Sequence, residues 1–121
     1  MQIYSFEKLD VWQRSRELTK MVYRLTQVFP SSEKFGLVSQ FQRACISVSS
    51  NIAEGTARKS YKEKARFTEV AYGSLMEVLN QLILSNDLNF ITVEQEKQAR
   101  LLIDEIGNKL NRLRQSQLNK N

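Results

Sequence analysis

Residues 67–83 read FTEVAYGSLMEVLNQLI and have the apolar spacing of an amphipathic helix. The same spacing of three and four residues recurs along most of the chain. We therefore expect helices over residues 8–29, 32–57, 61–86 and 93–115, followed by a polar tail over 116–121. One proline and four glycines in 121 residues are too few to separate many strands by turns. The sequence predicts an all-α fold, a single-domain antiparallel up-down four-helix bundle with short joints.

The ends of the predicted helices carry recognisable signals. Pro30 stops the first helix, because the residue before a proline is pushed out of the α region. Ser60 with Glu63, and Thr92 with Gln95, have the spacing of capping boxes at the third and fourth helices. The side chains expected to face the core are Val11, Trp12, Ser15, Leu18, Thr19, Val22, Tyr23, Leu25, Phe29, Val38, Phe41, Cys45, Val48, Ile52, Phe67, Ala71, Leu75, Val78, Leu82, Ala99, Leu102, Ile103, Ile106, Leu110 and Leu113.

The composition excludes several kinds of chemistry. The chain has no histidine, so it lacks Ser-His and Cys-His catalysis and imidazole metal ligands. Cys45 is the one cysteine and can form neither an intrachain disulfide nor a thiolate zinc site. It falls on an apolar stripe, where a small buried hydrophobic side chain is expected. The four glycines are isolated and form no phosphate-binding loop. We expect no enzymatic activity, no cofactor, no metal and no small-molecule substrate.

The sequence also suggests where the protein works. A single cysteine suits a reducing compartment. The longest weakly charged stretch, residues 35–53, contains Arg43 and many polar side chains, so we expect no membrane association. Residues 1–10 lack the charged-then-apolar pattern of a signal peptide. These features predict a cytoplasmic protein.

Positive charge is concentrated in two short segments. Residues 58–66 and 109–121 each carry +4, whereas the rest of the chain carries −3. An up-down bundle places both segments at one end, as phosphate-backbone binding requires. Basic residues at a helix C-terminus also complement the helix dipole, but Lys62 and Lys64 lie at a helix start. The predicted nucleic-acid-binding residues are Arg58, Lys59, Lys62, Lys64, Arg66, Lys109, Arg112 and Arg114.

Two helix faces point to self-association. The second helix carries short uncharged polar side chains opposite its core stripe, where a solvated face would be dense in Lys and Glu. The third helix has a second apolar stripe, and Gly73 in its middle costs about 1 kcal/mol relative to Ala. A broad intramolecular core would also explain these faces. The predicted interface residues are Gln40, Arg43, Ser47, Ser50, Asn51, Glu54, Tyr72, Met76, Leu79 and Ile83.

Ten short blocks of the sequence match one known pattern: FEKLDVWQ (6–13), FP (29–30), Glu33, GL (36–37), Gln40, RA (43–44), SNIAEG (50–55), Phe67, AYGSL (71–75) and Glu77. In these blocks the chain resembles one family, the 23S rRNA-intervening sequence proteins, also called four helix bundle proteins. The resemblance covers nearly the whole chain. Cys45 and Ser49 depart from the family pattern, where a small residue such as Ala and a Pro are expected.

The resemblance implies a small bacterial four-helix bundle that assembles as a ring-like homopentamer and has no enzymatic activity. Some members are encoded within insertions in large-subunit ribosomal RNA genes. The fold is similar to that of the accessory protein of diversity-generating retroelements, which contacts a reverse transcriptase and nucleic acid. The position of a gene within a ribosomal RNA insertion is not evidence that its product binds RNA.

Together these features predict a non-catalytic homo-oligomer, with a pentamer favoured. We expect it to bind RNA, DNA or a nucleoprotein through its basic end, with little dependence on base sequence. The alternative function is a protein–protein adaptor or scaffold, whose basic end meets an acidic protein surface and binds no nucleic acid.

Overall fold

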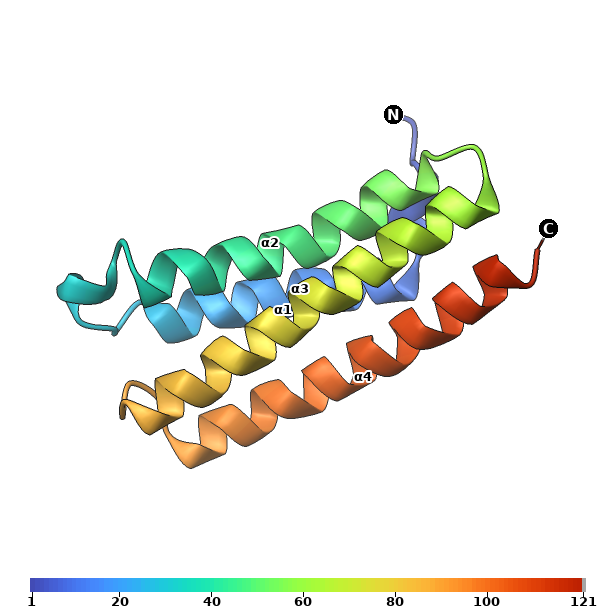
Figure 1. The fold of residues 1–121 in the computed structure, drawn as a ribbon. Coiled ribbons are helices and arrows are strands. Elements are labelled where there is room, and N and C mark those ends of the chain that lie inside the picture. The colour runs from blue at the N-terminus through green and yellow to red at the C-terminus, as the bar shows by residue number, and fades with distance from the viewer. Residues whose placement is uncertain (121) are drawn as a thin grey trace.

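Four helices make up nearly the whole protein (Figure 1). The computed structural model describes residues 1–120, and these contain no strand. The single-turn 3-10 helices η1 (Ser5–Lys8) and η2 (Ser31–Glu33) precede the first and second α-helices. The predicted all-α helical bundle is confirmed. Its four α-helices are α1 (Asp10–Thr26), α2 (Leu37–Thr56), α3 (Tyr61–Asp87) and α4 (Val93–Leu118).

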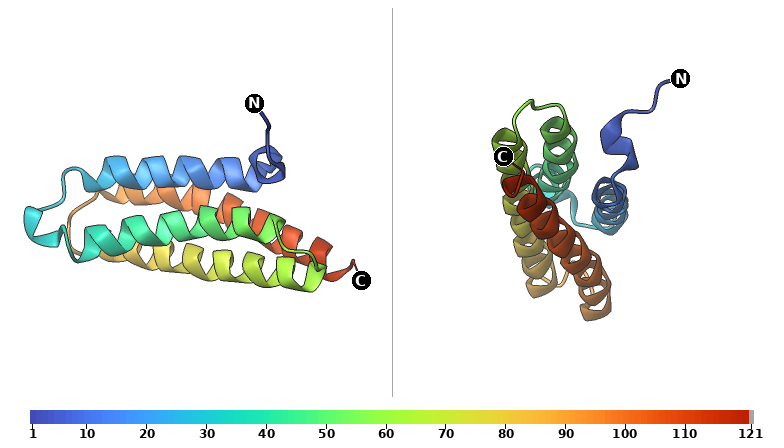
Figure 2. Two further views of the ribbon diagram at one scale, coloured as in Figure 1. Left: turned by 90° about the horizontal axis from the view of Figure 1, so that it is seen from above. Right: turned by 90° about the vertical axis from the view of Figure 1, so that its right-hand side faces the viewer.

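The helices follow one another in antiparallel order around a shared core (Figures 1 and 2). Helix α3 packs against α2 and α4, and α1 packs against the same two helices from the other side. Both chain termini and the α2–α3 joint lie together at one end of the bundle, the terminal end. The α1–α2 and α3–α4 joints lie at the opposite end. The up-down topology therefore brings the two basic segments to the terminal end.

Some helix limits differ from those expected. Helix α1 ends at Thr26 and α2 begins at Leu37, so the region around Pro30 is longer than predicted. The second helix does not start near Ser32, because η2 occupies that position and Gly36 takes a non-helical conformation (φ −111°, ψ −108°). At the other end of the chain, α4 continues to Leu118, so the first part of the predicted tail is helical. Residue 121, at the end of that tail, lies outside the described residues.

The predicted capping box is present at α4, whereas at α3 only the N-cap half of it is formed. The Ser60 hydroxyl accepts a hydrogen bond from the Glu63 amide at 3.1 Å. At α4 the box is complete, because Thr92 and Gln95 each accept from the other's backbone N–H. Helix α3 ends where Asn89 adopts a left-handed conformation with φ 63°, which Asn tolerates better than most residues. These caps satisfy backbone groups that would otherwise lack partners.

The core consists of the inward stripes of all four helices. Gly55 lets α2 and α3 approach closely, because a Cβ there would lie 3.0 Å from the Cβ of Phe67. Tyr23 does not widen the buried face of α1 as expected, because 40% of it is exposed. Leu25, Val38 and Leu113 are partly buried against the core. The core residues with almost no exposure include Leu18, Val22, Phe41, Cys45, Val48, Leu75, Val78, Leu82, Ile103, Ile106 and Leu110.

Candidate functional site

The basic residues of the α2–α3 joint and of the last turns of α4 gather at the terminal end. The right-hand view in Figure 2 looks onto this end and shows the α2–α3 joint near the C-terminus of α4. The two segments lie far apart in the sequence, so this juxtaposition depends on the topology of the bundle. The charge pattern, combined with an up-down bundle, predicts that these two basic segments lie at one end.

Three of the eight predicted phosphate-binding side chains have hydrogen-bond partners on other helices of the chain. The Lys64 ammonium donates to the Thr56 carbonyl at 2.9 Å, near the C-terminus of α2. Lys109 pairs with Asp10 and with Glu105, and these hydrogen bonds raise the pKa of its ammonium group. Arg114 pairs with the carboxylate of another residue, Glu69 on α3. These cations hold helices together or cap them, so their charge is partly compensated.

Two of the predicted residues, Arg58 and Arg66, have only weak partners within the chain. The Arg58 guanidinium lies over the ring of Phe67, 4.5 Å from the ring centroid. Arg66 lies 3.9 Å from the Glu63 carboxylate, and both side chains are largely exposed. A surface ion pair of this kind contributes little to stability. Both guanidinium groups therefore remain accessible to a ligand.

Of the eight predicted phosphate-binding residues, the most available to a partner are Lys59, Lys62 and Arg112. All three are exposed, and none forms a salt bridge with residues 1–120. The sequence alone does not separate them from Lys64, whose acceptor Thr56 lies on another helix. Lys109 has one acceptor on another helix, Asp10, and one on its own helix, Glu105, four residues earlier. We call Lys59, Lys62 and Arg112 the cationic surface.

Sequence analysis missed one contact at the terminal end. The Lys120 ammonium lies 5.3 Å from the ring centroid of Tyr61, the first residue of α3. Lys120 contributes to the charge of the basic tail, but neither it nor Tyr61 is among the predicted site residues. The pair is 59 positions apart, so no local pattern in the sequence reveals it.

The polar face of α2 divides into two parts. Ser47 shares a hydrogen bond of 2.8 Å with Ser74 of α3. Asn51 donates to the backbone and the hydroxyl oxygens of Ser47, at 2.8 and 3.1 Å. These residues therefore link helices within one chain. The other four predicted interface residues of this face are exposed, namely Gln40, Arg43, Ser50 and Glu54.

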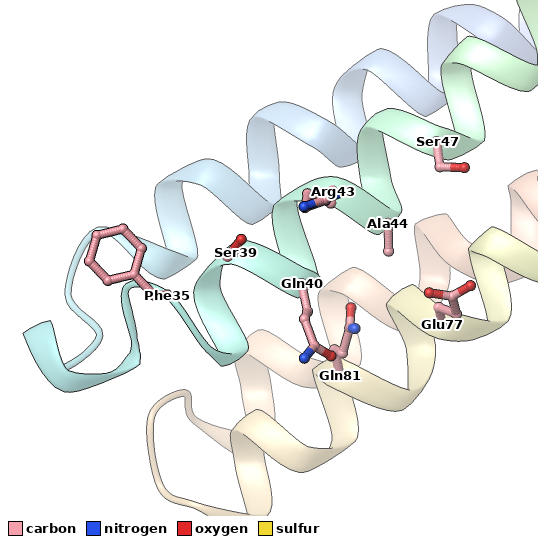
Figure 3. A pocket seen from close by; sticks show the side chains of 8 residues that line it. All are labelled: Phe35, Ser39, Gln40, Arg43, Ala44, Ser47, Glu77 and Gln81. Carbon is pink, nitrogen blue, oxygen red and sulfur yellow. The ribbon is translucent and has the colours of Figure 1, made fainter.

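A groove of about 580 Å³ runs between α2 and α3 (Figure 3). Gln40 and Gln81 point toward one another across it. Only 6% of Gln81 is exposed, and its amide can donate to the backbone oxygens of Gln40 and Glu77, each at 3.3 Å. Arg43 and Glu77 also line the groove, yet neither forms a salt bridge with any described residue. The groove thus presents one positive and one negative charge to a partner.

The second apolar stripe of α3 is also divided. Tyr72 and Leu79 pack against the core of the same chain, as the broad-core interpretation requires. Met76 is 37% exposed, and Ile83 is partly buried. Gly73 lies on the outer side of α3, where an added Cβ would meet nothing within 4 Å. The packing of this chain therefore gives no reason for a glycine at that position.

Cys45 lies in the core, with 1% of the residue exposed. Burial raises the pKa of its thiol to about 12, so the reactive thiolate is scarce near neutral pH. We expect a thiol reagent to label the native protein slowly and the denatured protein quickly. Cys45→Ala should lower the free energy of unfolding by about 1 kcal/mol through poorer packing, with secondary structure retained. Rapid labelling of the folded protein would contradict a purely structural role.

Among residues 1–120, no group of three His, Cys, Asp or Glu side chains is placed to hold a metal ion. None of the helices described is both long enough and apolar enough to cross a membrane.

Comparisons with known proteins agree with the fold. A search of curated proteins found no match. Among solved structures, the chain is similar to a crystal structure of a protein of unknown function from the S23 ribosomal protein family of Bacteroides thetaiotaomicron. The two chains are 23% identical, with a TM-score of 0.75 over 83% of this chain and 94% of the other. A family model described as 23S rRNA-intervening sequence protein matches residues 7–112, so the chain belongs to that family.

Proposed function

We propose that this protein is a non-catalytic helical bundle that binds the phosphate backbone of nucleic acid through its terminal end. The observation that carries the proposal is the cationic surface. Lys59 of the α2–α3 joint and Lys62 of the first turn of α3 belong to the same end of the bundle as the last turns of α4, which carry Arg112. None of the three has an acidic partner among residues 1–120. Exposed Lys and Arg side chains displace counterions from phosphates, which drives binding without reading the bases.

The proposed binding is weak for one subunit, because the cationic surface of one chain consists of three side chains only. Assembly with further copies would repeat the cationic surface around a ring and raise the overall affinity, provided that one nucleic acid spans several subunits. We therefore also propose that the protein is a homo-oligomer. Five subunits are the number that the family resemblance implies.

The outer sides of α2 and α3 support self-association. Gly73 costs about 1 kcal/mol relative to Ala in a helix interior, and no contact with the described residues 1–120 requires it. A glycine at this position would allow the backbone of another copy to approach α3 closely, because it has no side chain. Met76 is exposed nearby, and the groove offers Arg43 and Glu77 as opposite charges that copies of the chain can satisfy between them.

A pair of substitutions tests this face. Met76→Glu should reduce the oligomer size while leaving the stability of the subunit within about 0.5 kcal/mol, because the side chain is partly exposed. Leu79→Glu should instead lower the free energy of unfolding by about 2 kcal/mol or more, since Leu79 packs against the core. Light scattering gives the size, and circular dichroism gives the helicity and the unfolding curve. A wild-type protein that is monomeric at micromolar concentration would contradict self-association.

Direct binding measurements test the proposed function. Single- and double-stranded RNA and DNA should each bind at about 50 mM salt and bind much more weakly at about 200 mM salt. Heparin should compete, because it is also a polyanion. If none of the four nucleic acids binds at the lower salt, the proposal fails. Binding of acidic proteins under the same conditions would then favour the adaptor function.

A further inference from the structure

We infer that the terminal end also binds an unstacked nucleobase, so that its preferred ligand is a single strand rather than a duplex. This inference rests on the proposed function and names its substrate more closely. The site is a hollow of about 330 Å³ beside the cationic surface, on the first turns of α3. Its lining residues are Arg58, Glu63, Arg66, Phe67 and Val70.

The hollow contains a planar group suited to stacking. The Arg58 guanidinium, itself a planar group, lies over the Phe67 ring at 4.5 Å from the ring centroid, and this cation–π contact favours its position there. Unpaired bases stack on aromatic rings and on guanidinium planes in nucleic-acid-binding proteins. Val70, 48% exposed, adds an apolar wall. These groups favour a flat, partly apolar ligand.

The charges of the hollow favour a base over a second phosphate. The Glu63 carboxylate lies 3.9 Å from the Arg66 guanidinium, so a phosphate entering the hollow would approach a negative group. A nucleobase has both donors and acceptors on its edge, which match a carboxylate and a guanidinium respectively. Lys62 lies one helical turn before Arg66 and is placed to hold the adjoining phosphate.

Duplex bases cannot use this site, because they are already stacked and paired. A single strand can turn one base out of its path at little cost. The hollow therefore predicts a preference for single strands over duplexes. Charge alone predicts the opposite preference, since a duplex has the higher charge density.

A charge-preserving substitution distinguishes base binding in the hollow, which we call the base site, from phosphate binding by the cationic surface. The wild-type protein should bind a single strand of about 12 nucleotides roughly 10-fold more tightly than a duplex of equal length at the same salt. Arg58→Lys keeps the charge but loses the planar group, so it should weaken single-strand binding much more than duplex binding and remove most of this preference. Arg112→Lys is the matched control, outside the hollow, and should preserve the preference. An oligonucleotide with one 2-aminopurine should change its fluorescence on binding wild type, and much less on binding Arg58→Lys.

The possible outcomes distinguish the two claims. Equal affinity for single strands and duplexes, with no effect of Arg58→Lys, would overturn the base site and leave the cationic surface standing. An Arg112→Lys effect as large as that of Arg58→Lys would also overturn it, because the hollow would then have no special role. If the wild-type protein binds neither ligand, the proposed function fails and the base site fails with it.

Discussion

Replacing Lys59, Lys62 and Arg112 together with Gln should lower the affinity for nucleic acid by about 10³-fold for each engaged subunit at about 50 mM salt, since each neutralised phosphate is worth roughly tenfold there. All three side chains are exposed, and none pairs with an acid among residues 1–120. Their removal should therefore leave the fold and the oligomer size unchanged. Fluorescence anisotropy with a labelled oligonucleotide measures the affinity, and light scattering checks the assembly.

A second triple variant controls for total charge. Arg24, Lys34 and Lys97 are exposed and form no salt bridge within the described residues. They lie near the α1–α2 and α3–α4 joints, at the end opposite the cationic surface. Their joint replacement with Gln removes three positive charges, as the first variant does, and should change the affinity much less. Equal losses of affinity in the two variants would mean that binding follows net charge and not the terminal end.

Phe41→Ala should lower the free energy of unfolding by about 3–5 kcal/mol. Phe41 is the largest of the fully buried side chains and has no exposed surface, so its removal leaves a cavity between the helices. Phe35→Ala is the matched control, because Phe35 is 89% exposed and its removal should change stability by less than about 0.5 kcal/mol. Chemical denaturation followed by circular dichroism compares the two. A small effect of Phe41→Ala would mean that α2 does not pack as described.

The core is largely predictable from sequence, because burial follows helical periodicity. Phe41, Cys45, Val48 and Ile52 recur at intervals of three and four residues, and all are buried. Tyr23 fits the same periodicity and is 40% exposed, since a helix in contact with two neighbours buries only part of its circumference. Periodicity locates the centre of a buried face better than its edges.

The limits of α2 and the role of Leu79 are harder to predict, for different reasons. Ser32 and Glu33 resemble the start of a helix, but local hydrogen bonds turn this segment into a 3-10 helix before Gly36 interrupts it. Leu79 belongs to the second apolar stripe of α3, which would stay exposed if α3 had only one neighbouring helix. Helix α3 instead packs against both α2 and α4, so the core extends to Leu79.

The candidate site is predictable as a location but not residue by residue. The charge count and the topology together place two basic segments at one end. Lys64 donates to the Thr56 carbonyl and Arg114 pairs with Glu69, both on other helices. Lys109 pairs with Asp10 of α1 as well as with Glu105 of its own helix. Tertiary interactions of this kind decide which cations remain free, and a one-dimensional pattern does not contain them.

The salt dependence of binding tests the central claim most directly. The logarithm of the association constant with double-stranded DNA should fall linearly with the logarithm of the salt concentration. The Lys59, Lys62 and Arg112 variant should have a slope shallower than wild type by about 2.7 for each engaged subunit, at about 0.9 for each phosphate that is no longer neutralised. The Arg24, Lys34 and Lys97 variant should keep the wild-type slope. Identical slopes for wild type and the cationic-surface variant would show that these three residues do not contact phosphate.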